Sequence, residues 1–252
     1  MRIYLAGTNG MKQAFQEEKI IPTSVNVLES FYSIQDWQIN FIHKFNDFVL
    51  DSGAFTFLNS KKKKIDFVKY AEEYANFICQ NKIDKFFELD LDAIIGIKQT
   101  EKLRERIEKI TNKQCIPVWH KNRGLQYYRD MCKDYNYVAI GGLALKEIPL
   151  NQFEKMFGWF INVAHKNKTK IHGLGYTSTE KLHQYHFDSV DSSTWSMGSR
   201  FGELSIFTKE RIERHRERSN GVKLRRLKNV YDADVHNFKE WIKFGKYAEI
   251  YL

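Results

Sequence analysis

The 252-residue sequence has few cysteines and prolines, and it has no long apolar run. Its three cysteines, Cys79, Cys115 and Cys132, are widely spaced and form no CxxC pair. This spacing argues against a disulfide framework and against a cysteine zinc cluster. No apolar run reaches the roughly 18 residues of a membrane span, and the N-terminus MRIYLAGTNG lacks the pattern of a signal peptide. We therefore expect a cytoplasmic protein with no membrane partner.

What the sequence does contain is positive charge, with a formal net charge of +9 and an isoelectric point near 9.2. Residues 208–229 hold nine lysines and arginines against three glutamates, so this segment carries six of the nine net positive charges. The run Lys61 to Lys64 is expected to be a solvated loop. Concentrated positive charge favours a polyanionic partner, and residues 208–229 are the candidate phosphate-binding segment.

Seven short apolar runs, four of which end in glycine or an acidic residue, alternate with longer amphipathic segments. They span residues 3–8, 48–53, 85–92, 115–120, 137–143, 170–175 and 186–191. Strands that alternate with helices predict a parallel sheet with right-handed crossovers. The spacing favours an α/β fold of the (β/α)8 TIM-like barrel type, with an eighth strand expected between 200 and 235. Since no linker is visible, we expect residues 1–252 to form one domain.

Between these runs, apolar residues recur at three- and four-residue steps, which is typical of amphipathic helices. In residues 64–80 the apolar stripe consists of Phe67, Tyr70, Tyr74, Phe77 and Ile78. Similar patterns predict helices over 100–110, 150–166 and 177–185, and the basic C-terminal segment, about 205–252, is predicted to be helical.

In a parallel barrel the active site lies at the carboxyl ends of the strands, so the residues that end the apolar runs are candidates for chemistry. They are Asp51, Asp90 with Asp92, Trp119 with His120, Gly141 with Gly142, His172 to Gly175, and Asp191. Two carboxylates at one rim allow one to act as a nucleophile and the other as an acid/base, as in retaining glycosyl transfer. Glycines give a planar ligand close access to the backbone. With the basic charge, this set predicts that the reacting sugar belongs to a nucleotide.

Four of these segments resemble motifs of the tRNA-guanine transglycosylase superfamily, in the same order along the chain. LDSGAFTF (50–57) resembles the strand-end motif DSGGFQ, and AIGGLAL (139–145) resembles the base-binding turn IGGL. IHGLGYTSTEKL (171–182) is similar to MGVGTPEDL. FDSVDSS (187–193) has the spacing of VDMFDC, whose second Asp is the nucleophile. The resemblance covers about residues 45 to 202.

The resemblance implies a role for each matching residue. Asp191 is the nucleophile, Asp51 is the general acid/base, and Asp188 is structural. FELDLD resembles the family's FDE motif, so Asp90, or else Asp92, reads the guanine edge. PVWH stands where the family has VQG, so the family's recognition Gln is absent. The other residues implied to line the base pocket are Trp119, His120, Gly141, Gly142, His172 and Gly173.

Arg200 corresponds in spacing to a family arginine that lies near the nucleic-acid backbone. The basic segment supplies the remaining candidates for phosphate contact, which are Lys209, Arg211, Arg214, Arg218, Arg225 and Arg226. Binding through these side chains is expected to weaken steeply with salt.

The chain has no counterpart of the family's CxCxxC and His zinc site, so no metal is expected. In this respect, and in VDSSTW, it is more similar to DpdA-type DNA-guanine transglycosylases, which put 7-deazaguanines into DNA. The resemblance thus implies a pentosyltransferase that replaces guanine in DNA with a 7-deazaguanine derivative through a covalent Asp-glycosyl intermediate, without a cofactor. The implied partners are DNA, the free 7-deazaguanine base and a protein that opens the duplex.

Three alternatives remain open from the sequence. The first is a tRNA-guanine transglycosylase, which differs only in its polymer. The second is a non-catalytic nucleic-acid-binding relative that serves as a partner subunit. The third is an unrelated barrel glycosidase, for which the basic segment has no use. The composition, rich in lysine and asparagine and poor in proline, is typical of an AT-rich genome such as that of a phage.

Overall fold

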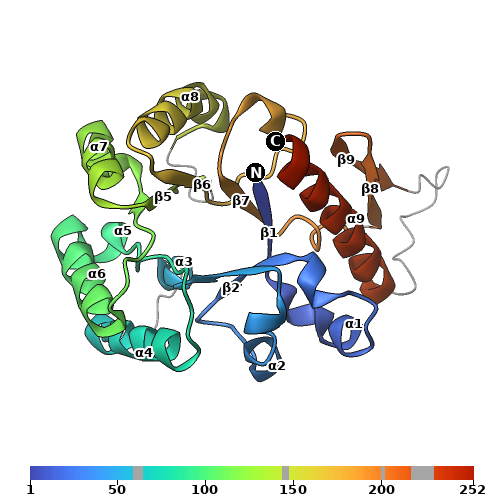
Figure 1. Cartoon of the computed structure of the whole chain (residues 1–252), viewed down its shortest axis with the longest axis horizontal. Coiled ribbons are helices and arrows are strands. Elements are labelled where there is room, and N and C mark those ends of the chain that lie inside the picture. The colour runs from blue at the N-terminus through green and yellow to red at the C-terminus, as the bar shows by residue number, and fades with distance from the viewer. Residues whose placement is uncertain (59–64, 144–147, 200–201, 217–229) are drawn as a thin grey trace.

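The computed structural model describes residues 1–58, 65–143, 148–199, 202–216 and 230–252 (Figure 1). Seven parallel strands form one curled sheet in the order β3-β2-β1-β7-β6-β5-β4. This α/β architecture is compatible with a TIM-like fold. The strands are β1 (Arg2–Ala6), β2 (Asn26–Ser30), β3 (Asp47–Asp51), β4 (Val118–Trp119), β5 (Tyr137–Ile140), β6 (Lys170–Gly173) and β7 (Ser189–Ser192).

The predicted barrel of eight regular strands is confirmed only in part. Strand β2 is one that the sequence analysis missed, and the described part of residues 200–235 adds no strand to this sheet. The predicted strand over 85–92 is reduced to single parallel bridges. Phe86 pairs with Leu50 of β3, and Phe87 pairs with Ile116, two residues before β4. Backbone hydrogen bonds through this short segment connect β3 to Ile116, in the segment that leads into β4.

Helices lie around the outside of the sheet (Figure 1). Helices α4, α6 and α8 confirm the predictions for 64–80, 100–110 and 150–166. No helix of the described ranges is both long enough and apolar enough to cross a membrane. The helices are α1 (Lys12–Gln16), α2 (Asp36–Ile39), α3 (Ala54–Leu58), α4 (Phe67–Gln80), α5 (Asp92–Ile95), α6 (Ile97–Thr111), α7 (Gly124–Asp134), α8 (Leu150–Lys166) and α9 (Val230–Tyr251).

Helix α4 shows why these segments are helical. The Asp66 carboxylate accepts hydrogen bonds from the backbone N–H groups of Val68 at 3.1 Å and Lys69 at 3.0 Å, which caps the first turn. Tyr74 and Ile78 from the predicted stripe are fully buried. The cap fixes where the helix begins, and the apolar stripe fixes which side of it faces the sheet.

The prediction of a helix over 177–185 is wrong. Most backbone hydrogen bonds there span three residues, as from Lys181 N to Ser178 O at 2.9 Å, and the segment forms only a 3-10 turn at Leu182–Gln184. The rings of Tyr176 and Tyr185 pack on Phe157 of α8 at centroid distances of 4.9 and 5.1 Å. These tertiary contacts outweigh the helical preference of a segment that is only two turns long.

The prediction of helix over the first part of 205–252 is also wrong. The chain forms an antiparallel hairpin of β8 (Glu203–Thr208) and β9 (Arg211–Arg216), and only α9 is helical. Lys209 in the turn has a positive φ of 54°. Side chains of α9 bind the backbone of β8, because Asn237 accepts from Ser205 N at 2.7 Å and Glu240 accepts from Phe207 N at 2.8 Å. The hairpin is therefore stabilised by a helix that lies beside it.

Alternate residues of each strand point to opposite faces of the sheet. The outer face packs against the helices and buries most of the large apolar side chains. The register aligns Val118, Ala139 and His172 as neighbours on β4, β5 and β6. The concave face holds a smaller apolar cluster formed by Tyr4, Leu28, Val49, Phe87, Ile116, Val118 and Ala139.

Candidate active site

The residues that end parallel strands lie at one edge of the sheet, as the sequence analysis expects. Asp51 is the last residue of β3, and Asp191 lies near the end of β7. Asp90 follows the bridging residues Phe86 and Phe87. The charges of Asp90 and Asp191 both act on the carboxyl group of Asp51, so three carboxylates share this edge.

Asp51 is the carboxyl group whose electrostatic environment is best defined. Burial, followed by the negative charges of Asp90 and Asp191, raises the pKa of Asp51 to about 7. A hydrogen bond from Gly53 N at 2.9 Å acts in the opposite direction. A carboxyl group with a pKa near neutrality is suited to both release and take up a proton.

The backbone conformation and close packing explain why the LDSGAF segment has a glycine at position 53. Gly53 has a positive φ of 78°, and a Cβ atom there would lie 2.5 Å from Cβ of Tyr32 and 2.7 Å from Oγ of Ser30. Only glycine fits this turn, which aims Gly53 N back at the Asp51 carboxylate.

Asp90 is paired with His120, the residue after β4. His120 Nε2 lies 3.1 Å from Asp90 Oδ2, and both side chains are largely buried. Gly141 leaves room for this imidazole, since a Cβ atom on Gly141 would lie 2.9 Å from its Cε1 atom. The structure therefore brings Asp90, His120 and Gly141 together at the edge where the sequence analysis predicts the base pocket.

Asp92 lies in a different environment, and the structure contradicts its prediction as a base contact. Arg123 binds its carboxylate at two points, from Nε to Oδ2 at 2.5 Å and from Nη2 to Oδ1 at 2.7 Å. Arg123 also donates to Glu88 Oε1 at 2.8 Å, and all three side chains are buried. Both oxygens of Asp92 are occupied in an ion-pair cluster, so of the two aspartates Asp90 is the one left to read a base.

Asp191 is held through one of its two carboxylate oxygens. Its Oδ1 accepts a hydrogen bond from Gly175 N at 2.6 Å and lies 3.2 Å from His172 Nε2. Asp188, on the same segment, instead contacts Ile171 N at 2.8 Å and His165 Nε2 at 3.1 Å near the amino end of β7. The two aspartates of this stretch therefore face different surroundings, and only Asp191 lies at the edge with Asp51.

His172 does not lie where the resemblance implies. Its side chain is fully buried on the concave face, with its ring 5.2 Å from that of Phe87 and 6.1 Å from that of Tyr4. Both ring nitrogens are engaged, Nε2 with Asp191 and Nδ1 with Ser189. The fully buried imidazole therefore contacts Asp191, and the prediction that it lines the base pocket is wrong.

Trp119 is likewise part of the core. Its indole is 2% exposed and packs on Phe160 of α8 with ring centroids 4.6 Å apart, while its Nε1 donates to Gly124 O at 2.8 Å. Strand alternation explains this, because Val118 and His120 face the concave side and the residue between them faces the helices. The predicted base contact of Trp119 is therefore wrong.

Gly142 and Gly173, the other two glycines predicted to line the base pocket, are needed for different structural reasons. Gly142 has a positive φ of 87°, a conformation that favours glycine. A Cβ atom on Gly173 would lie 3.3 Å from both Phe187 and Val190, so this glycine permits close packing beside β7. Their contact with a base stays a prediction.

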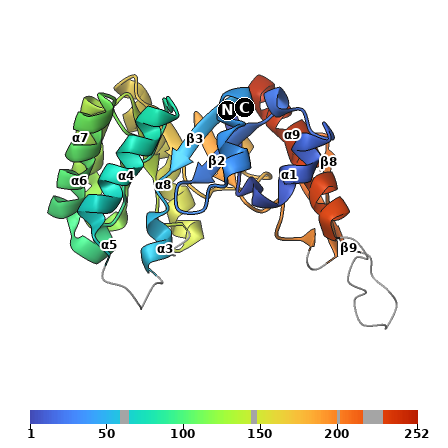
Figure 2. The same cartoon turned by 90° about the horizontal axis from the view of Figure 1, so that it is seen from below.

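The predicted phosphate contacts divide into two groups. Lys209, Arg211 and Arg214 lie on the β8–β9 hairpin, where their side chains are exposed. The others, Arg200, Arg218, Arg225 and Arg226, lie outside the described residues, as does the run Lys61 to Lys64. Arg211 is paired with Glu213 at 2.9 Å, whereas Arg214 forms no ion pair within the described part of the chain. The hairpin and α9 lie on the opposite side of the molecule from α6 and α7 (Figure 2).

The sequence analysis missed three groups that are linked to Asp191 by hydrogen bonds, one directly and two through His172. They are the backbone N–H of Gly175, which it considered only as a strand end, and the hydroxyl groups of Ser189 and Tyr137. Side-chain alternation could have predicted the two hydroxyl groups. Residues two apart on a strand point to the same face, so Ser189 shares a face with Asp191 on β7, and Tyr137 shares a face with Ala139 on β5.

Within the described ranges, no group of three or more His, Cys, Asp or Glu side chains is arranged to hold a metal ion. Comparison of the chain with models of known protein families and with curated proteins gives no match.

Proposed function

We propose that this chain is a base-exchange glycosyltransferase that replaces guanine in DNA with a 7-deazaguanine derivative, with Asp191 as the nucleophile and Asp51 as the general acid/base. The single observation that carries the proposal is the grouping of Asp51, Asp90 and Asp191, in which burial and two neighbouring charges raise the pKa of Asp51 to about 7. One carboxyl group poised for proton transfer beside an anchored carboxylate is the arrangement that double displacement at a sugar carbon requires.

In the first step, an oxygen of Asp191 forms a bond to C1′ of the target nucleotide as the C1′–N9 bond breaks. The electron pair of that bond goes to guanine N9, which takes a proton from Asp51 or from water. The target nucleotide has to leave the base stack first, which costs a few kcal/mol.

In the second step, the incoming base gives its N9 proton to the Asp51 carboxylate and attacks C1′, which releases Asp191. Asp90, which is paired with His120, reads the edge of either base in this proposal. One glycosidic bond replaces another, so the overall exchange needs no external source of energy.

The fold and the charge support the proposal in two further ways. The bridges at Phe86 and Phe87 are compatible with a complete (β/α)8 barrel in which residues 85–88 take the place of a regular strand. Lys209 and Arg214 on the hairpin are exposed cations suited to phosphate contact.

The test is incorporation of a labelled 7-deazaguanine base into single-stranded DNA, duplex DNA and tRNA by the purified protein. We expect exchange into DNA, accumulation of a protein–DNA adduct that survives denaturation when the incoming base is left out, and loss of both in Asp191→Asn. Exchange into tRNA alone would replace DNA as the substrate. Absence of any exchange, or full exchange by Asp191→Asn, would contradict the proposal.

A further inference from the structure

A line of polar side chains lies beside the apolar cluster on the concave face of the sheet. Ser189 Oγ lies 2.5 Å from the hydroxyl oxygen of Tyr137 and 2.5 Å from His172 Nδ1. His172 Nε2 in turn lies 3.2 Å from Asp191 Oδ1. We call these four residues, Tyr137, Ser189, His172 and Asp191, the interior column. They come from the neighbouring strands β5, β6 and β7.

The interior column is costly to bury unless its members bind one another. Ser189 is 1% exposed and His172 is fully buried, among neighbours such as Phe87 and Ala139. The interiors of parallel barrels are usually filled by branched apolar side chains, and a buried polar group without a hydrogen-bond partner destabilises the fold. Each member of the column is therefore constrained to the partner that it has.

The contacts of His172 are consistent with one tautomer. A carboxylate oxygen only accepts hydrogen bonds, so Nε2 of a neutral imidazole carries the proton that is donated to Asp191. Nδ1 is then an acceptor and takes the hydroxyl proton of Ser189, whose oxygen accepts from Tyr137. All three donors consequently point along the column toward Asp191.

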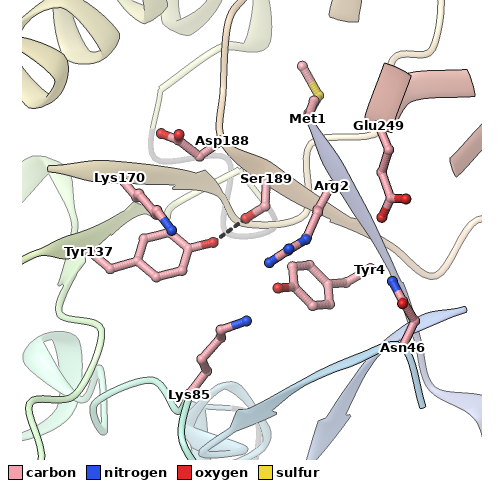
Figure 3. A pocket seen from close by; sticks show the side chains of 10 residues that line it. All are labelled: Met1, Arg2, Tyr4, Asn46, Lys85, Tyr137, Lys170, Asp188, Ser189 and Glu249. Carbon is pink, nitrogen blue, oxygen red and sulfur yellow. Dashed lines mark hydrogen bonds between the residues drawn. The ribbon is translucent and has the colours of Figure 1, made fainter. Parts of the chain in front are cut away.

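The far end of the column reaches a pocket at the amino ends of the strands. Tyr137 and Ser189 line this cavity of about 540 Å³, and their hydroxyl groups meet at its edge (Figure 3). Arg2, Lys85 and Lys170 also line it. The column therefore extends from Asp191, at the carboxyl edge, to the opposite end of the sheet.

We propose that His172 is a positioning residue for Asp191, and that Ser189 and Tyr137 fix the tautomer in which it acts. The proposal rests on the proposed role of Asp191 as the nucleophile. His172 Nε2–H and Gly175 N–H both bind Oδ1. Oδ2 accepts no hydrogen bond from the described residues, so it is the oxygen left to form the bond to C1′. A histidine held in the wrong tautomer would present a lone pair to Oδ1 and turn the carboxylate away.

The first test measures single-turnover formation of the protein–DNA adduct together with DNA affinity. His172→Leu and Ser189→Ala are expected to slow adduct formation by about 10- to 100-fold, as is typical when a group that orients a metal-binding side chain is removed, while the Kd for DNA stays unchanged. His172→Gln is expected to recover part of the rate, because its side-chain amide can still donate to Asp191. Tyr137→Phe, at the far end, is expected to give the smallest loss.

The matched control is Tyr128→Phe, which removes a buried hydroxyl group that donates to Phe160 O at 3.0 Å outside the column. It is expected to leave the adduct rate unchanged. If wild-type protein forms the adduct and Ser189→Ala and His172→Leu form it equally fast, the positioning role is overturned while the proposed function stands.

The second test needs no activity and separates the two proposals. ¹⁵N NMR of the histidine rings is expected to show His172 protonated at Nε2 and unprotonated at Nδ1, with a change in its Nε2 signal in Asp191→Asn. A His172 protonated at Nδ1 alone would overturn the proposal. Should the wild-type protein form no adduct, the proposed function fails, and this spectrum still decides whether the column has the inferred polarity.

Discussion

The imidazole of His120 occupies the space into which a side chain on Gly141 would project. A Cβ atom on Gly141 would lie 2.9 Å from Cε1 of His120 and 2.8 Å from Cγ1 of Val118. Gly141→Ala is therefore expected to lower the free energy of unfolding by about 1–3 kcal/mol, the usual cost of overpacking. It should also slow base exchange, because His120 holds Asp90. Urea denaturation and the exchange assay measure the two effects.

Gly158→Ala is the control for this substitution. Gly158 lies within α8, and a Cβ atom there meets nothing within 4 Å. Alanine in a helix interior is favoured over glycine by up to about 1 kcal/mol, so this variant is expected to be more stable with unchanged exchange. Equal stability of the two variants would refute the assigned packing of Gly141 against His120.

The neighbouring aspartates Asp90 and Asp92 are expected to respond oppositely to substitution. Asp92→Ala breaks a buried pair and should destabilise the protein by about 3 kcal/mol, the low end of the range for such losses, because Arg123 keeps Glu88. Asp90→Asn should change stability little and reduce base exchange at least tenfold. Chemical denaturation and exchange kinetics on both variants check these two expectations. If the Asp92→Ala protein were as stable as wild type but had lost base exchange, Asp92 would instead be a base-contacting residue.

Much of the fold could be predicted from periodicity, because helices such as α8 have long amphipathic stripes and β1 and β5 are compact apolar runs. Strand β2 was missed since NVLES contains only two strongly apolar residues, and its Asn26 and Glu29 are satisfied by partners far away in the sequence. The β8–β9 hairpin was missed because its charge pattern also fits a helix, and the contacts that decide between them come from Asn237 and Glu240 on α9.

The sequence predicts those residues of the candidate site that lie where a predicted strand ends. Asp51 and Asp191 follow from the rule that parallel strands end at one edge. For Trp119 and His172 the rule is not sufficient, because it does not say to which face of the sheet the side chain points. Only the alternation of side chains along the strand distinguishes the two faces. In β4 the alternation points Trp119 toward the helices, where it packs on Phe160. In β6 it points His172 to the concave face, where it contacts Asp191.

The stability of the protein is expected to fall as the pH rises from about 4 to about 7, in part because of Asp51. Its pKa is raised to about 7 in the folded state and is near 4 in an unfolded chain. Between these values the folded state keeps a proton that the unfolded state releases, so folding is favoured at the acidic end and loses this contribution above about pH 7. Asp51→Asn removes the effect, and thermal melts at a series of pH values should show that its stability relative to wild type is greatest at pH 8.

Glu29→Gln is the matched variant for Asp51→Asn. Burial also raises the pKa of Glu29 to about 7, and its carboxylate binds Thr8 at the backbone and the side chain instead of the site residues. The two variants should therefore flatten the pH dependence of stability in the same direction, while only Asp51→Asn loses base exchange. Parallel loss of exchange in Glu29→Gln would indicate that activity follows stability and not the chemistry of Asp51.

The two exposed arginines of β9 are expected to contribute unequally to DNA binding. Arg214 forms no ion pair in the described part of the chain, whereas Arg211 is already neutralised by Glu213 at 2.9 Å. Each phosphate contact changes the slope of log K against log salt by about 0.9. Arg214→Ser should therefore reduce the slope by nearly one, and Arg211→Ser by clearly less, in anisotropy titrations between about 50 and 200 mM salt.

The control is Arg129→Ser. Arg129 is an exposed residue of α7, which lies on the other side of the molecule (Figure 1), so this substitution should leave the slope unchanged. Equal slopes for all three variants would mean that the hairpin does not face the phosphates, and the basic surface that binds DNA would have to lie elsewhere.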